Sequence, residues 1–184
     1  MHINRYTIDA LRVQECDQLL EIGMGNGFFV SEILTGHPLV KYVGCDFSPV
    51  MVREAEIMNE RFITACQAEF CLTSAEILPF DDGIFDKVFS VNTIFFWDDS
   101  RLILSEIRRV LKPAGEIIIS VRPKATMEAL PFVKYGFNTF SKEDLKALLI
   151  QSFMVTAVIE KREPDQEING DKIPMESLIV WAMK

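Results

Sequence analysis

The chain has 184 residues, of which 49% are hydrophobic, so it is long enough to bury a core and fits one domain over residues 1–184. Its net charge of -8 makes a large basic surface unexpected, which argues against nucleic acid and anionic membranes as partners. The sequence shows no signal-peptide pattern and no apolar run of the roughly 18 residues that span a membrane, so we expect a cytoplasmic protein.

Short apolar runs alternate with longer amphipathic segments, which is typical of βαβ units that build a parallel sheet. We predict strands over residues 18–22, 40–45, 69–72, 85–91 and 116–121. Two later runs, 153–159 and 177–182, are joined by a polar stretch over 161–172 and can pair as an antiparallel hairpin. The expected fold is α/β: a three-layer αβα sandwich around a mostly parallel, doubly wound seven-stranded sheet with an antiparallel C-terminal hairpin.

Three of the predicted helices have clear start signals. Ser48 is an N-cap followed by proline, and Asp98-Asp99-Ser100 begins a second helix. Ser141 opens a third helix with a capping box that uses Asp144 in place of the preferred glutamate. The first helix is expected to run through Met51, Ala55 and Met58. The second carries an apolar stripe at helical spacing, made of Leu102, Ile103, Ile107, Val110 and Leu111. Residues 122–140 show weak periodicity and are interpreted as a functional loop.

Histidine and cysteine offer little for metal or triad chemistry. His2 lies at the terminus and His37 precedes a proline in a turn. The four cysteines have no metal-ligand spacing, and we expect them to be small buried residues in a reducing compartment. They are Cys16, Cys45, Cys66 and Cys71. We therefore predict no metal site.

The strongest local signal is a strand that breaks into a glycine-rich turn and then opens a helix, LLEIGMGNGFFV at residues 19–30. Glycine permits close approach of a nucleotide-like ligand and the φ values that such a turn needs. The following helix start can offer backbone N–H groups to a ligand carboxylate or phosphate. A tight connection that binds no ligand would show the same glycines.

A carboxylate follows the second predicted strand at Asp46, about twenty residues beyond the glycine turn, where an acidic side chain can accept hydrogen bonds from both ribose hydroxyls. Two adjacent strands would then present their carboxyl ends at one crevice. Asp46 could otherwise be an ordinary loop carboxylate or a cap of the helix that begins near Ser48.

These residues carry a resemblance to a known family. EIGMGNG at residues 21–27 matches the acidic-x-Gly-x-Gly-x-Gly motif of class I, Rossmann-like, S-adenosylmethionine-dependent methyltransferases. SAEILPFDDGIFD at 74–86 is similar to the family's third-strand exit, where a polar residue and the next backbone N–H hold the adenine. VFSVNT at 88–93 and VLKPAGEI at 110–117 resemble its later motifs. The resemblance covers roughly residues 15–122.

The resemblance implies S-adenosylmethionine as the cofactor and a set of residues that bind it. It places Asp46 at the ribose, and Glu21 near the methionyl amine, directly or through water. Many members carry aspartate where this chain has Ser74, so the adenine amino group would meet a hydroxyl or a carbonyl; Ser74 could also simply cap a turn. The implied cofactor-binding residues are Glu21, Gly23, Met24, Gly25, Asn26, Gly27, Asp46, Phe47, Ser74, Ala75 and Asn92.

Other carboxylates look structural. Asp86 would lie near the amino end of the fourth strand, opposite the ligand crevice, and Asp81 and Asp82 precede Gly83 in a surface turn.

On the acceptor side, Trp97 follows the fourth strand with Phe95 and Phe96, and an aromatic face there could stabilise a cation or hold an apolar acceptor. We predict that Trp97 and Tyr135 contact the acceptor. Trp97, Phe95 and Phe96 could equally pack beneath residues 122–140, and Tyr135 could be a packing or surface residue of that segment. Methyl transfer is an in-line displacement that needs no dedicated base, and we assign no catalytic residue.

The sequence thus predicts an S-adenosylmethionine-dependent methyltransferase with a small-molecule acceptor, and it leaves the oligomeric state open. The regions expected to choose the acceptor, 1–13 and 122–140, hold aromatics and few charges, which favours an apolar-faced molecule. A non-catalytic S-adenosylmethionine-binding protein of the same fold is one alternative. An NAD(P)-dependent oxidoreductase is another, but the evenly spaced glycines and the lack of a second catalytic domain argue against it.

Overall fold

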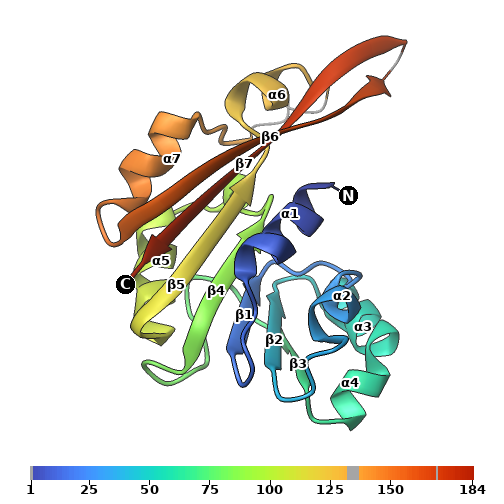
Figure 1. The fold of residues 1–184 in the computed structure, drawn as a ribbon, viewed down its shortest axis with the longest axis vertical. Coiled ribbons are helices and arrows are strands. Elements are labelled where there is room, and N and C mark those ends of the chain that lie inside the picture. Colours follow the sequence, from blue (N-terminus) through green and yellow to red (C-terminus); the bar gives the residue numbers. More distant parts are fainter. Residues whose placement is uncertain (1, 132–136, 169) are drawn as a thin grey trace.

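The computed structural model describes residues 2–131, 137–168 and 170–184, and in them seven strands form one sheet (Figure 1). The strand order is β3-β2-β1-β4-β5-β7-β6. The first five strands are parallel, and β7 runs antiparallel to both β5 and β6. The bounds are β1 Gln18–Ile22, β2 Lys41–Asp46, β3 Ala68–Leu72, β4 Phe85–Val91, β5 Leu111–Val121, β6 Met154–Ile168 and β7 Asp171–Met183. The predicted αβα fold is confirmed.

Helices cover both faces of this sheet. Their bounds are α1 His2–Leu11, α2 Val30–Leu34, α3 Pro49–Met58, α4 Glu60–Thr64, α5 Ser100–Val110, α6 Lys124–Glu128 and α7 Lys142–Leu149, with a 3-10 helix η1 at Ile94–Phe96. Apolar residues of α1, α2 and α4 pack with Leu19 and Tyr42 on one face. Those of α5, α6 and α7 pack with Leu20 and Val88 on the other. Because neighbouring strand residues point to opposite faces, burial on both sides explains the nearly continuous hydrophobicity of the strands.

The predicted helix starts are confirmed. The Ser48 hydroxyl accepts a hydrogen bond from the Met51 N–H, and the Asp99 carboxylate accepts bonds from the first turn of α5. Ser141 and Asp144 form the reciprocal capping box. The apolar stripe predicted for the second helix is partly wrong: Leu102 is 47% exposed while Leu104 is buried, and Leu111 already belongs to β5.

The C-terminal strands are much longer than predicted. The polar stretch over 161–172 is mostly strand, and β6 and β7 extend past the rest of the sheet as a two-stranded arm (Figure 1). On this arm Ile173 and Met175 are buried in the main core, and most of the charged residues are exposed, although Glu163 is buried. Because charged residues dominate 161–172, the sequence did not predict strands there. Residues 122–140 are likewise not one loop, since α6 lies within them and buries Met127.

The expectation that all four cysteines are buried was also wrong, because Cys16 and Cys66 are exposed in turns with positive φ.

The order of the strands in the sheet defines where a ligand can bind. The chain runs from β1 outward to β3 and then returns to place β4 on the other side of β1. The carboxyl ends of β1 and β4 therefore flank a topological switch point, where open α/β sheets bind their ligands.

Candidate functional site

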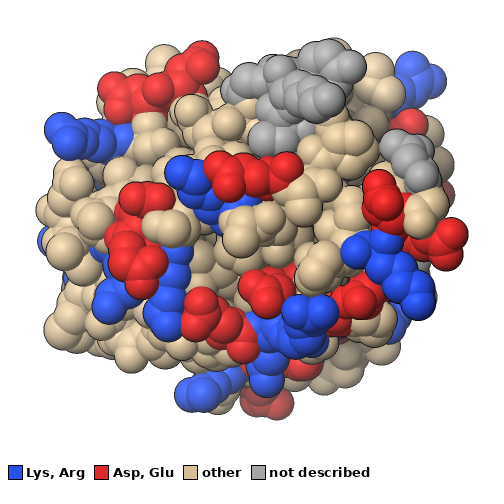
Figure 2. All heavy atoms as spheres, turned by 90° about the horizontal axis from the view of Figure 1, so that it is seen from above, with Lys and Arg blue, Asp and Glu red and all other residues tan. Residues whose placement is uncertain are grey.

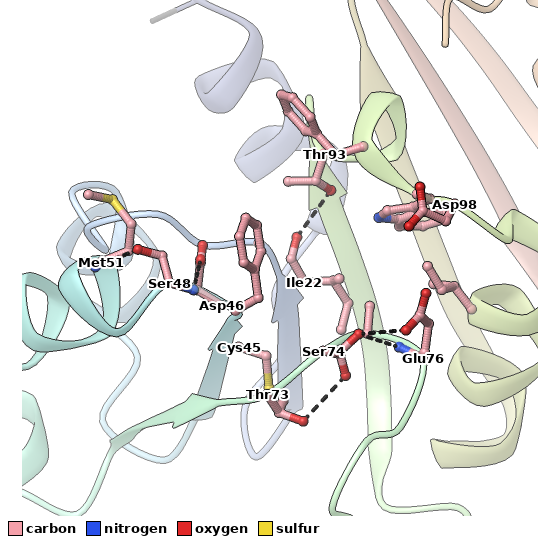
Figure 3. A pocket seen from close by; sticks show the side chains of 16 residues that line it. Ile22, Cys45, Asp46, Ser48, Met51, Thr73, Ser74, Glu76, Thr93 and Asp98 are labelled. Atoms are coloured by element: carbon pink, nitrogen blue, oxygen red, sulfur yellow. Dashed lines mark hydrogen bonds between the residues drawn. The ribbon is translucent and has the colours of Figure 1, made fainter. Parts of the chain in front are cut away.

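A cavity of about 540 Å³ lies at this carboxyl edge, within the size range of small-molecule sites (Figure 3). The carboxyl ends of two strands and the segments that follow four strands form its wall. They contribute Ile22 and Gly23 at the end of β1; Cys45, Asp46, Phe47, Ser48 and Met51 at the end of β2 and beyond it; Thr73, Ser74, Ala75 and Glu76 after β3; and Thr93, Phe96, Trp97, Asp98 and Ile103 after β4. The cavity thus brings together Gly23, Asp46, Phe47, Ser74, Ala75 and Trp97 of the predicted site.

The glycine turn is held tightly against β2 and β4. Gly23 has φ +72°, and a Cβ there would lie 2.2 Å from Cγ2 of Thr93, so no other residue fits without a shift. The N–H groups of Gly23 and Met24 both donate to the carbonyl of Cys45, at 2.7 and 3.2 Å. These contacts fix the position of the turn at the cavity.

Asp46 joins the turn to the start of α3. Its Oδ2 accepts from the Gly25 N–H at 3.0 Å. Its Oδ1 accepts from the Ser48 N–H at 2.9 Å (Figure 3). A carboxylate oxygen can accept two hydrogen bonds, so each still has capacity for a ligand hydroxyl. The carboxylate is buried at the cavity wall with its position fixed by backbone donors.

Ser74 belongs to a turn that also brings Glu76 to the cavity. The Ser74 hydroxyl donates to Oε2 of Glu76 at 3.1 Å and accepts from the Glu76 N–H at 3.3 Å (Figure 3). Ser74 therefore caps a turn, as one of the two interpretations expected, and it also lines the cavity. Glu76 supplies a carboxylate two residues beyond the position where many family members have one.

The other end of the cavity is aromatic. Trp97 is 5% exposed and lines the cavity, whereas Phe96 also lines it but is 62% exposed. The Phe96 ring meets Phe137 edge-on at 5.1 Å between centroids, and the Asn138 N–H donates to the carbonyl of Phe95. The segment after residue 136 is thus anchored to η1, beside the aromatic wall.

Glu21 does not line the cavity. It is buried beneath the glycine turn, where the Tyr42 hydroxyl donates to its Oε2 at 2.6 Å. Burial raises the pKa of Glu21 to about 7; the Tyr42 hydrogen bond opposes this shift and the Asp46 charge adds to it. A carboxyl group with this pKa changes charge near neutral pH, directly behind the turn.

The remaining predicted residues take supporting positions outside the cavity wall. Met24 packs against Val52 and Ala55 of α3, and the carbonyl of Gly27 accepts from the Asn59 side chain at 3.1 Å. Gly25 is tied to Asp46, as described above, and Asn26 is partly buried in the same turn.

Asn92 links the ends of β4 and β5. It has φ +56°, and its Oδ1 accepts from the Arg122 N–H at 3.1 Å. Tyr135 lies outside the described residues. Asp86 has the structural role expected of it, since it accepts from the Gln18 N–H and pairs with Lys112 at the amino edge of the sheet.

Sequence reasoning missed several residues of the cavity wall: Met51, Thr73, Glu76, Thr93 and Asp98. One signal could have found most of them, because loops that follow parallel strands meet at the same edge of a sheet. Within the described ranges no group of three or more His, Cys, Asp or Glu is arranged to hold a metal ion. No helix in the same ranges is long and apolar enough to cross a membrane.

The cavity fits a nucleoside-type cofactor. Gly25 has φ +59° with no atom within 4 Å of the place where its Cβ would be, so the turn leaves open space for a ligand. Asp46 can accept hydroxyl hydrogens, and the segment Ser74–Ala75 offers a hydroxyl and a backbone beside it. The fold and this edge define an α/β protein of the Rossmann-like, nucleoside-cofactor-binding class.

Comparison with known proteins gives the particular family. A family described as "Methyltransferase domain" matches residues 20–119. The uncharacterized methyltransferase YdaC of Bacillus subtilis is 30% identical over 145 residues, which are 79% of this chain and 77% of that protein. The C-methyltransferase UbiE of Desulfotalea psychrophila is 31% identical over 66% of this chain, but the match spans only 48% of its own length.

Solved structures show the same fold at low identity. A SAM-dependent methyltransferase from Aquifex aeolicus has a TM-score of 0.76 with 20% identity, covering 97% of this chain and 88% of that one. A geranyl diphosphate methyltransferase in complex with SAM has a TM-score of 0.77 with 12% identity, covering 97% and 83%. The chain belongs to the methyltransferase-domain family and is a class I methyltransferase that uses S-adenosylmethionine as its cofactor. The oxidoreductase alternative is therefore wrong.

Proposed function

We propose that the chain methylates a small, largely apolar acceptor that lies against Phe96 and Trp97. The observation that carries this proposal is the lining of the cavity: the segments at the ends of β1 and β2 contribute backbone and Asp46, whereas the segment after β4 contributes Phe96, Trp97 and Ile103, together with the carboxylate of Asp98. The first set of residues suits an adenosine, which has a polar sugar. The second offers aromatic and aliphatic surface of the kind that binds an apolar molecule.

The cofactor-binding roles are proposals of the same kind. Asp46 would accept the ribose hydroxyls, and Ser74 with the Ala75 backbone would hold the adenine. The turn from Gly23 to Gly27 would lie along the remainder of the molecule, with Glu21 behind it toward the methionyl amine. When bound, S-adenosylmethionine supplies an electrophilic methyl group on a sulfonium, so the chain needs no further electrophile.

The work left to the protein is alignment and exclusion of water. Trp97 and Ile103 are buried at the cavity, and their apolar surface would help to hold an acceptor in line with the methyl group. We assign no general base, because an acceptor that is already a good nucleophile needs only positioning.

Charge and relatives both favour a small molecule. On the face seen in Figure 2, basic side chains are interspersed with acidic ones, and the net charge of -8 opposes binding to a polyanion. Among the relatives are UbiE, named for ubiquinone and menaquinone biosynthesis, and a sterol 4-C-methyltransferase of Caenorhabditis elegans. A tRNA U34 carboxymethyltransferase also matches, at 30% identity over 57% of this chain. RNA is therefore the rival acceptor to test.

The test is a transfer assay with methyl-labelled S-adenosylmethionine and a panel of quinols, phenols, sterols and prenyl diphosphates, with tRNA as the rival. We expect label on at least one apolar small molecule and none on tRNA. Trp97→Ala should raise KM for that acceptor and leave the affinity for S-adenosylhomocysteine unchanged. Label on tRNA alone would overturn the proposal, and cofactor binding without transfer to any acceptor would favour the non-catalytic alternative.

A further inference from the structure

Two cysteines occupy directly opposed positions on neighbouring parallel strands at the cavity. Cys45 of β2 is the register partner of Cys71 of β3, so both side chains point to the same face of the sheet. Neighbouring strands lie about 4.8 Å apart, inside the range of roughly 4.4–6.8 Å between Cα atoms that a disulfide requires. The strands therefore already place these two residues at a distance that a disulfide can bridge.

The two thiols differ in access. Cys45 is 2% exposed and forms part of the cavity wall, whereas Cys71 is partly exposed and lies on the edge strand of the sheet. Both pack in the same apolar cluster. A reagent from solvent can reach Cys71 first, and Cys45 is the thiol next to it.

The pKa shifts of the two thiols also make Cys71 the one that reacts first. A hydrogen bond from Cys45 lowers the pKa of Cys71, although burial and the nearby Glu69 oppose that shift. The same hydrogen bond, together with burial, raises the pKa of Cys45. Of the two sulfurs, the more accessible one therefore has the lower pKa and the larger share of thiolate, which is the nucleophilic form.

We propose that Cys45 and Cys71 form a dithiol site that hydrogen peroxide closes to an intrachain disulfide, and that this closure weakens binding in the adjoining cavity. The Cys71 thiolate attacks one peroxide oxygen, the O–O bond breaks, and one water leaves after protonation, which gives a sulfenic acid. The Cys45 sulfur then attacks the Cys71 sulfur and expels the second water. Two thiols are oxidised to one disulfide while one peroxide is reduced to two waters.

The cavity would change because both cysteines are tied to it. The carbonyl of Cys45 accepts the N–H groups of Gly23 and Met24, and the next residue is Asp46. Cys71 lies two residues before Thr73, which lines the cavity. Drawing the two sulfurs together shifts the support of the glycine turn and the segment after β3. This effect on cofactor binding rests on the proposed cofactor site, whereas the disulfide itself does not.

The test uses the full chain with Cys16→Ser and Cys66→Ser, which removes the two exposed thiols. After treatment with hydrogen peroxide, we expect the mass to fall by two hydrogen atoms and a Cys45–Cys71 peptide to appear. Affinity for S-adenosylhomocysteine should fall by about tenfold or more and return on reduction. Adding Cys71→Ser should abolish the loss of affinity.

Oxidation of Cys71 to higher acids without a link to Cys45, or retention of both thiols, would overturn the proposed site. A mapped disulfide with unchanged affinity would overturn the link to the cavity. If the reduced protein itself does not bind S-adenosylhomocysteine, the proposed cofactor site fails together with that link, and peptide mapping still decides whether the disulfide forms.

Discussion

The two sides of the sheet use their polar residues in opposite ways. At the end of β2, each carboxylate oxygen of Asp46 accepts one backbone N–H and can still accept a hydrogen bond from a ligand in the cavity. Beyond β5, Arg122 donates to both oxygens of Glu163, to the Ser177 hydroxyl and to the carbonyl of Glu176, and Ser177 donates to Glu163 in turn. The hydrogen bonds of Asp46 leave it able to bind a ligand, whereas those of Arg122 hold the C-terminal arm against the end of β5. Buried charge alone therefore does not mark a binding site.

Breaking the hydrogen bonds of Arg122 should have the largest effect on stability. In Arg122→Met the Glu163 carboxylate stays buried without its partner, and we expect the free energy of unfolding to fall by about 3–5 kcal/mol. Urea denaturation measures this change. The double variant Arg122→Met with Glu163→Leu removes the uncompensated charge and should recover much of the loss. If the double variant is as unstable as the single one, the ion pair is not what locks the arm.

The second prediction concerns Glu21, behind the glycine turn, and the pH dependence of the free energy of unfolding. The folded state keeps its proton up to about pH 7, whereas the unfolded carboxyl releases it near 4.5, so this group makes the free energy of unfolding fall as pH rises between these values. The whole effect is about 3 kcal/mol, at roughly 1.4 kcal/mol for each unit. Urea denaturation at a series of pH values should show this fall in the wild type and lose it in Glu21→Gln.

The same experiment has a second variant. The Tyr42 hydroxyl opposes the rise in the pKa of Glu21, so Tyr42→Phe should extend the fall in stability to higher pH, while its start near pH 4.5 stays unchanged. An identical pH dependence in the wild type and Glu21→Gln would show that this carboxyl is not protonated in the folded state at neutral pH.

A smaller effect tests α7, which packs against β6 and β7 away from the arm (Figure 1). The Ser141 hydroxyl accepts the Asp144 N–H in the capping box of α7, and Ser141→Ala should lower the free energy of unfolding by about 1 kcal/mol. Ser105, exposed inside α5, is a matched control, since Ser105→Ala should have no destabilising effect. Equal stability of the two variants would contradict a role for the cap.

The same contrast explains what could be predicted from the sequence. Local chemistry encodes the glycine turn, Asp46 and the caps at Ser48 and Ser141, because each depends on residues a few positions apart. The length of β6 and β7 depends on pairing between distant charged residues and on burial of Ile173 and Met175 against the core, which no local pattern reveals. The pairing of Cys45 with Cys71 likewise requires the strand register.

Isothermal titration with S-adenosylhomocysteine tests most directly whether the glycine turn and Asp46 form the cofactor site. Asp46→Asn removes a charge and one acceptor from the cavity, and we predict a loss of affinity of about tenfold or more. Asp81→Asn makes the same change at an exposed position outside the cavity wall and should bind as the wild type does. Wild-type affinity in a folded Asp46→Asn variant would contradict the account.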